Sequence, residues 1–183
     1  MNWTRTLFLL LAAFLAVFWQ AAFGGIRWLT GAQVDFLPCI MVYAALTGNI
    51  FEVSVLAVLG GTWLDSLSAN PLGTSVLPLF VVGLGILAAS ELILKDETFA
   101  QFMFGLIASA LSPLLTLLLL LTVGHSPLIG WGTVWQWFIM GLLGAAATPL
   151  WFGVFDWLDR NFAHSRATTS SFRPDREIRR GRK

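Results

Sequence analysis

The stretch that decides the fold is GGTWLDSLSANPLG, residues 60–73, in which an apolar run meets one carboxylate and then a turn. Asp65 lies near the end of the run. Pro71 and Gly73 stop the run, because proline and glycine favour turns over continued helix. A carboxylate at membrane depth costs up to about 3 kcal/mol on insertion scales, so it is rare without a partner or a role. We therefore interpret the rest of the chain around Asp65.

The overall composition is that of an integral membrane protein. Of the 183 residues, 57% are hydrophobic and 11% are charged, and the mean hydropathy is +0.77. Soluble domains carry about 25% charged residues, so this chain lacks the polar side chains that would cover a water-facing surface. The single cysteine, Cys39, excludes an intramolecular disulfide and a cysteine-rich metal site. We interpret it as a small buried hydrophobe.

Six apolar segments emerge with windows of about 18 to 20 residues, the length of a helix that crosses a bilayer. They run from about 6 to 23, 36 to 48, 50 to 67, 72 to 94, 98 to 123 and 131 to 158. The second is short. A re-entrant loop is the alternative there, which leaves five spans and puts the termini on opposite sides. We favour six, and we predict an all-α bundle of six transmembrane helices.

Basic residues are distributed unevenly about this bundle. With six spans, Arg5, Lys95 and the eight Lys and Arg residues from Arg160 onward lie on one side, and Arg27 alone lies opposite. This ten-to-one asymmetry places both termini in the cytoplasm. We expect residues 1–160 to form the bundle and residues 161–183 to form a basic, disordered tail. Such a tail rests on anionic lipid, and we do not expect it to bind nucleic acid.

Small residues at four-residue spacing predict where helices pack closely in lipid. Four such rows stand out: Gly141, Ala145, Pro149 and Gly153; Gly105, Ser109 and Pro113; Ala12 and Ala16; Ala44 and Gly48. The prolines at positions 78, 113 and 149 are expected to kink their helices.

Two interpretations of Asp65 stay open from sequence alone. In one, the carboxylate is buried and pairs with a helix, an arginine or a partner protein. In the other, it lies at the outer membrane surface near Trp63 and caps the following turn. A dyad with Glu52 is excluded, because 13 residues of helix separate the two by about 20 Å. Four acidic residues are expected to be solvated near cytoplasmic helix ends: Glu52, Glu91, Asp156 and Asp159.

No sequence pattern points to catalysis or to a metal. His125 falls in an outer loop and His164 in the tail, so the two histidines share no helix face. Gly73 and Ser75 give the Gly-x-Ser pattern of an intramembrane serine protease, but the bundle has no histidine base. Glycine loops that cradle phosphate and clusters of metal ligands are also missing. We predict a non-enzymatic protein without a cofactor.

Three short motifs remain. Pro38 opens the second segment after Asp35, Gly-x-x-x-Asp ends at Asp65, and PLG at residues 71–73 opens the fourth segment. With these motifs, its size, its number of spans and its basic cytoplasmic end, the chain resembles the bacterial rod shape-determining MreD family over about residues 1–160. Thr62 departs from the family, which usually has an aliphatic residue at this position.

The resemblance implies a non-enzymatic inner-membrane subunit of the cell-elongation machinery. It would bind the single-pass protein MreC and so couple MreB filaments to RodA and its partner transpeptidase. The expected contact is either the row Gly141, Ala145 and Pro149 or the outer surface from Asp65 to Gly73. Such proteins are similar in fold to the substrate-binding subunits of energy-coupling-factor vitamin transporters. A vitamin-binding subunit is therefore the alternative, although the apolar segments offer few polar residues for its pocket.

Overall fold

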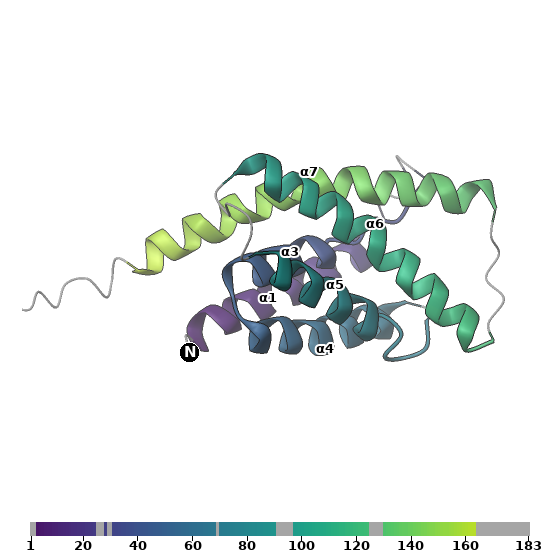
Figure 1. The fold of residues 1–183 in the computed structure, drawn as a ribbon, viewed down its shortest axis with the longest axis horizontal. Coiled ribbons are helices and arrows are strands. Elements are labelled where there is room, and N and C mark those ends of the chain that lie inside the picture. Colours follow the sequence, from purple (N-terminus) through teal and green to yellow (C-terminus); the bar gives the residue numbers. More distant parts are fainter. Residues whose placement is uncertain are drawn as a thin grey trace, which may run out of the picture. The chain divides into compact units, whose positions relative to one another are not determined.

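The computed structural model of the chain describes residues 3–24, 28, 31–68, 70–90, 97–124 and 130–163. These residues form helices joined by turns, with no strand among them (Figure 1). The helices are α1 (Trp3–Ala22), α3 (Leu37–Thr47), α4 (Ile50–Leu67), α5 (Val76–Ala89), α6 (Thr98–Thr122) and α7 (Trp131–Ala163). The prediction of an all-helical chain is confirmed. The chain divides into two compact units, a bundle unit of Met1–Phe152 and a second unit of Gly153–Lys183, and the boundary falls in the sequence of α7.

Each of the six predicted segments contains a helix, but the helices differ in length. Among the described residues, α1, α4, α6 and α7 are long and apolar enough to cross a membrane. α3 and α5 have 11 and 14 residues. At 1.5 Å per residue they extend about 16 and 21 Å, against a hydrocarbon core of about 30 Å. Four helices therefore have spanning length by themselves.

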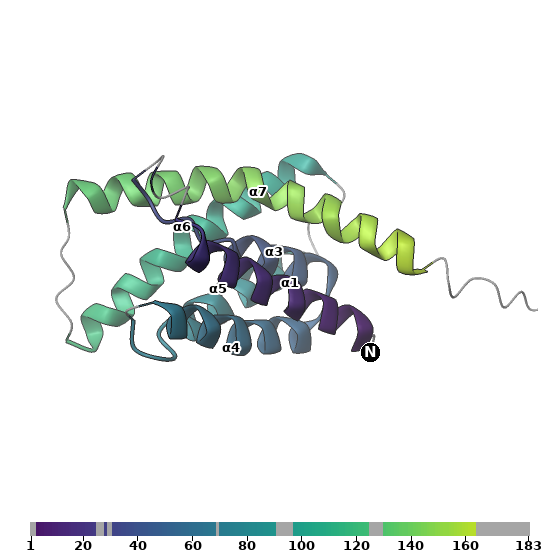
Figure 2. The same ribbon diagram turned by 180° about the vertical axis from the view of Figure 1, so that it is seen from behind.

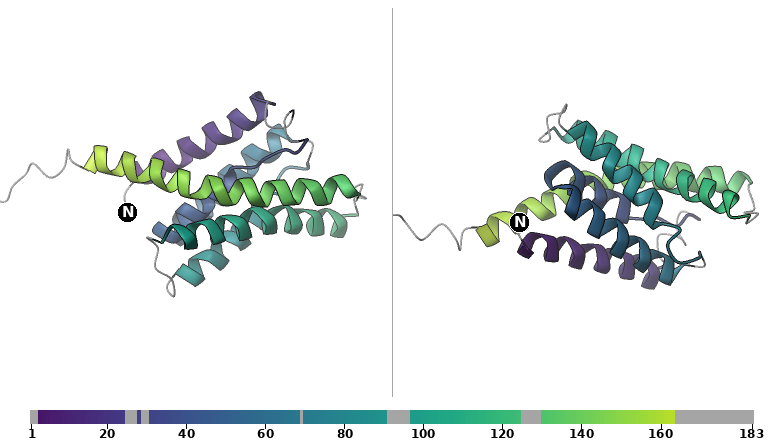
Figure 3. Two further views of the ribbon diagram at one scale, coloured as in Figure 1. Left: turned by 90° about the horizontal axis from the view of Figure 1, so that it is seen from above. Right: turned by 60° about the horizontal axis from the view of Figure 1, so that its bottom comes forward.

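α3 lies at the centre of the bundle unit. Every residue from Leu37 to Leu46 is buried, and α3 contacts α1, α4, α5 and α6. Figure 2 and Figure 3 show these helices around it. A helix that is apolar on all sides belongs in such a position, because no face of it gains from contact with water.

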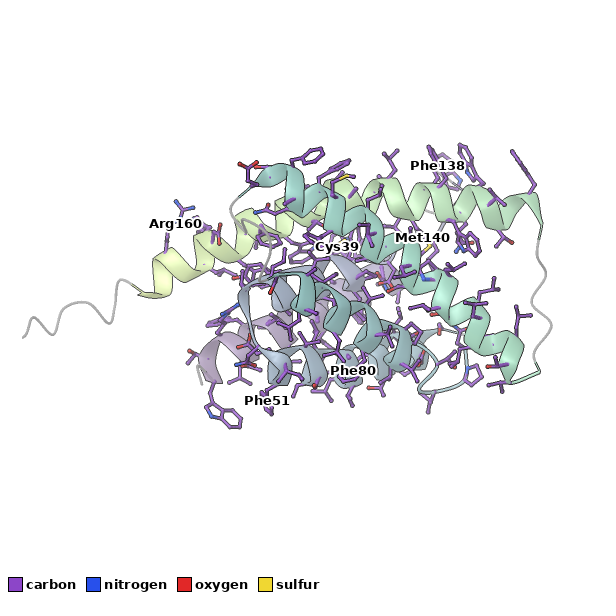
Figure 4. The ribbon with its side chains drawn as sticks, in the orientation of Figure 1. Cys39, Phe51, Phe80, Phe138, Met140 and Arg160 are labelled. Carbon is purple, nitrogen blue, oxygen red and sulfur yellow. The ribbon has the colours of Figure 1, made fainter. Side chains whose placement is uncertain are left out.

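Glycines allow the closest helix approaches in the bundle unit. An added Cβ at Gly105 of α6 would overlap the Thr148 side chain, and one at Gly144 of α7 would overlap Ser109. Cys39 lies at this contact, and its buried thiol donates to the Gly144 carbonyl at 3.3 Å (Figure 4). The close packing of small residues between α6 and α7 therefore uses Gly105 and Ser109 of the row predicted on α6. On α7 the contact is made by Gly144 and Thr148, which lie outside the row predicted there.

The three prolines do not have equivalent positions. Pro113 and Pro149 lie inside α6 and α7, as expected. Pro78 is the third residue of α5, which begins at Val76. The first helical N–H groups have no intrahelical acceptor, so a proline there breaks no hydrogen bond. The expectation that Pro78 kinks its helix is wrong, because residues 72–75 form a turn and not the first turn of helix.

Candidate functional site

Asp65 is buried near the C-terminal end of α4, with 2% of its surface exposed. Its carboxylate accepts three hydrogen bonds from the turn that precedes α5. The donors are the Gly73 N–H at 2.8 Å, the Ser75 N–H at 3.0 Å and the Ser75 hydroxyl at 2.6 Å. The carboxylate is therefore both buried and a cap for the turn, and no arginine of the described residues forms an ion pair with it.

The turn is built from residues that suit its geometry. Gly73 has φ of +93°, in the left-handed region that favours glycine. The backbone N–H and the hydroxyl of Thr74 both donate to the Pro71 carbonyl, at 3.2 and 2.6 Å, and close the turn. Leu72, between the proline and the glycine, is 74% exposed. The turn therefore directs its N–H groups toward Asp65 and presents an apolar side chain at its tip.

Gly61 brings α4 close to the start of α5. An added Cβ there would lie 2.8 Å from Val76 Cα and 2.9 Å from Val76 N. These are backbone atoms, which move only if α5 moves. Because Gly61 and Asp65 are four residues apart, they lie on the same face of α4. Gly61, Asp65, Pro71 and Gly73 thus belong to one substructure, residues 61–76, which we call the α4–α5 corner.

Asp35 and Pro38 form a second cap, at the start of α3. The Asp35 carboxylate accepts from the Leu37 N–H at 2.9 Å and from the Gln20 amide at 3.5 Å. Pro38 occupies the first turn of α3, where no helical N–H is lost. Burial raises the pKa of Asp35 from its ordinary value of 3.8 to about 6, and the charge of Asp65 adds to this increase.

The predicted row on α7 is occupied by the chain's own packing. Ala145 is fully buried. Gly141 is also buried, and a Cβ added there would lie 3.9 Å from the Cβ of Ala110 on α6. Pro149 is half-buried. Of the two faces proposed from sequence for a partner, the α4–α5 corner is the one with an exposed tip.

Sequence analysis missed a polar cluster at the opposite end of α4. Glu52 is 5% exposed, with its carboxylate 3.9 Å from the Arg5 guanidinium and 3.4 Å from the Thr6 hydroxyl. Arg5 also donates to the Thr47 carbonyl at 3.0 Å and so ties α1 to α3. The expectation of a solvated Glu52 is wrong, because α1 packs against α4. The opposite charge of Arg5 at the start of the first segment was the available signal.

Other predicted positions lie outside the described residues: Arg27, Glu91, Lys95, His125, the Asp159 side chain and the tail from His164 onward. Asp156 is exposed, as expected. Within the described ranges, no three His, Cys, Asp or Glu side chains come together as a metal site.

The comparisons with known proteins leave the chain without an assigned relative. It matches no protein-family model, no curated protein and no solved structure.

Proposed function

We propose that the chain is a non-enzymatic subunit of the bacterial cell-elongation machinery, of the MreD type, and that its α4–α5 corner contacts a single-pass MreC-type protein. The six segments cross the inner membrane with both termini in the cytoplasm, and α3 and α5 complete their crossings with the flanking turns. The partner couples cytoplasmic MreB filaments to RodA and the elongation transpeptidase.

The observation that supports this proposal most is the convergence of the motif residues. Two of the three motifs that carry the resemblance, Gly61 to Asp65 and Pro71 to Gly73, build a single corner held by three hydrogen bonds to one carboxylate. The third motif, with Pro38, lies at the start of α3. This corner projects Leu72 outward, with 74% of its surface exposed. A preformed projection loses little conformational freedom on binding, which favours its use as a contact for another protein.

The same corner argues for a structural rather than a catalytic role of Ser75. Its hydroxyl is 2.6 Å from the Asp65 carboxylate and is 5% exposed as a residue. A serine nucleophile needs a base that removes its proton and access to a substrate. The burial of Ser75 leaves its hydroxyl little access to a substrate, and this supports a role as a donor that holds the turn.

The outer face of α1 supports placement in a bilayer. Leu7, Leu11, Leu15 and Phe18 are between 54% and 61% exposed, and their spacing puts them on one side of the helix. A soluble monomer rarely exposes a continuous apolar stripe of this kind. Lipid tails are the surroundings that suit it.

Co-purification tests the proposal. The tagged full-length chain, co-expressed with the MreC-type protein of the same bacterium, is expected to retain that protein in mild detergent. Leu72→Glu should reduce retention without lowering the melting temperature, because the side chain is already exposed. Val123→Glu is the matched control, since Val123 is 64% exposed and follows α6 on the same side of the membrane in the proposed topology. If the wild-type chain retains no MreC-type protein, the proposal fails and the vitamin-transporter alternative moves ahead.

A further inference from the structure

A cavity of about 390 Å³ lies among the segment before α3, the start of α5, the second half of α6 and the first half of α7. Small-molecule sites typically have volumes of about 300–1,000 Å³. Part of its lining is apolar, including Leu117 of α6 and Met140 of α7. Figure 4 shows Met140 directed from α7 toward α6, whereas Phe138 points away. The remaining lining is polar, so the cavity suits a molecule with both kinds of surface.

Ser112 lines this cavity with a hydrogen-bonding group that the protein leaves unused. The residue is 6% exposed, and its Oγ is buried without a hydrogen-bond partner. Buried hydroxyls are nearly always paired, because an unpaired one has lost its water without compensation. Because this Oγ has almost no accessible surface, the Ser112 side chain must turn toward the cavity before a polar atom of a bound molecule supplies the missing partner.

The described lining of the cavity carries one acidic side chain, Asp35, and no Lys or Arg. The Asp35 carboxylate accepts from the Leu37 N–H and the Gln20 amide, and no Lys or Arg of the described residues forms an ion pair with it. A carboxylate without a cation beside it attracts cations and repels anions. Trp137, also in the lining, offers an aromatic ring of the kind that binds ammonium groups.

We infer that this cavity binds one small organic cation, with an ammonium group near Asp35, a hydrogen-bonding group at Ser112 and an apolar portion along Leu117 and Met140. The ammonium belongs either to a free amine or to the headgroup of a lipid such as phosphatidylethanolamine, which share this chemistry. The inference stands independently of the proposed function, because it requires neither the exposed tip of the α4–α5 corner nor a protein partner.

Three related probes test this inference on the full-length chain in nanodiscs of phosphatidylglycerol. Tyramine carries an ammonium, an aromatic ring and a phenol; tyrosol replaces the ammonium with a neutral hydroxyl; phenethylamine lacks the phenol. By calorimetry, tyramine is expected to bind at least about tenfold more tightly than tyrosol, a ratio typical of one charge-assisted contact.

Addition of phosphatidylethanolamine to the nanodiscs shows whether the natural ammonium belongs to a lipid headgroup or to a free amine. A weaker apparent affinity for tyramine and retention of that lipid in native mass spectra indicate the headgroup, and an unchanged affinity indicates a free amine.

Two variants separate binding from folding. Asp35→Asn keeps an oxygen that accepts from the Leu37 N–H, and it should abolish the preference for tyramine over tyrosol. Ser112→Ala should weaken tyramine about fivefold and leave phenethylamine unaffected, while Ser54→Ala, on α4 outside the cavity lining, changes neither. Equal binding of tyramine and tyrosol, or no binding at millimolar tyramine, would overturn the inference. If Asp35→Asn lowers the melting temperature, its loss of binding is not informative and the test rests on Ser112→Ala. In that case, an equal loss of affinity for tyramine and phenethylamine in Ser112→Ala overturns the inference.

Discussion

The Ser75 hydroxyl, just before α5, donates a hydrogen bond of 2.6 Å to the Asp65 carboxylate near the end of α4. The Ser75 backbone N–H donates to the same carboxylate at 3.0 Å, so Ser75 alone contributes two hydrogen bonds across the α4–α5 corner. Both residues are buried, and water therefore competes little for these bonds. Hydrogen bonds to a charged group contribute about 1.5–3 kcal/mol each. The corner is thus a stabilised unit of the fold.

Removal of the Asp65 carboxylate should destabilise the bundle. Asp65→Leu leaves the Gly73 N–H and both Ser75 donors without acceptors, at a cost on the order of 3 kcal/mol or more. Ser75→Ala removes one of the bonds and should cost less, about 1.5–3 kcal/mol. Thermal unfolding of the purified variants in detergent measures both. An Asp65→Leu variant as stable as the wild type would show that the cap does not stabilise the fold.

Gly61 should tolerate no side chain. Gly61→Ala places a methyl group against the backbone of Val76, and overpacking of this kind typically costs about 1–3 kcal/mol. Gly85→Ala is the matched control, because Gly85 lies within α5 with nothing near its added Cβ. There alanine should stabilise the helix by up to about 1 kcal/mol. The melting temperature is expected to fall for the first variant and not for the second. Equal shifts for the two would contradict the close approach.

The sequence predicted the helices well and their environment less well. The apolar windows located the six helices that the structure describes in full, and the PLG motif at residues 71–73 located the turn before α5. The predicted start of the segment that contains α5, at residue 72, is four residues early. The N–H groups of Gly73 and Ser75 donate to the Asp65 carboxylate and not to a helical carbonyl, and an apolar window does not detect this difference. Hydropathy also does not show that α3, with 11 residues, is shorter than a helix of spanning length.

Burial of polar side chains was the weakest part of the sequence analysis. Glu52 is held by Arg5 and Asp35 by Gln20, both from α1, so the surroundings of these carboxylates depend on how α1 packs. The cavity at Ser112 likewise forms from segments that are far apart in the chain. Asp65 was singled out because a carboxylate at the end of an apolar run is costly, but its partners, Gly73 and Ser75, were not predicted.

The pH dependence of stability should identify Asp35. Burial raises its pKa from 3.8 to about 6 in the folded chain. Between these values the folded state binds more protons than the unfolded state, so the contribution of Asp35 to stability decreases as pH rises from 4 to 7. Asp35→Asn removes this dependence. The melting temperature of the variant minus that of the wild type should therefore increase over this range. A constant difference would show that Asp35 titrates with an ordinary pKa.

The Arg5 and Glu52 side chains should be energetically coupled. Arg5→Ala leaves the buried Glu52 carboxylate without its cation, and loss of one partner of a buried pair typically costs about 3–5 kcal/mol. Glu52→Gln removes the charge and keeps an oxygen for the Thr6 hydroxyl. The double variant should therefore be more stable than the sum of the single effects predicts. Thermal unfolding of all four proteins completes the cycle, and additive effects would mean that the two groups do not interact.

The most direct test of the proposed function is site-specific photocrosslinking at Leu72. A photoreactive amino acid replaces Leu72, or Val123 in the control, in full-length chain expressed with the MreC-type protein of the same bacterium. Both positions are exposed, at 74% and 64%, so the substitutions should leave the fold intact. We predict a crosslink to the MreC-type protein from position 72 and none from position 123. No crosslink from position 72, or equal crosslinks from both positions, would contradict the assignment of the α4–α5 corner as the partner contact.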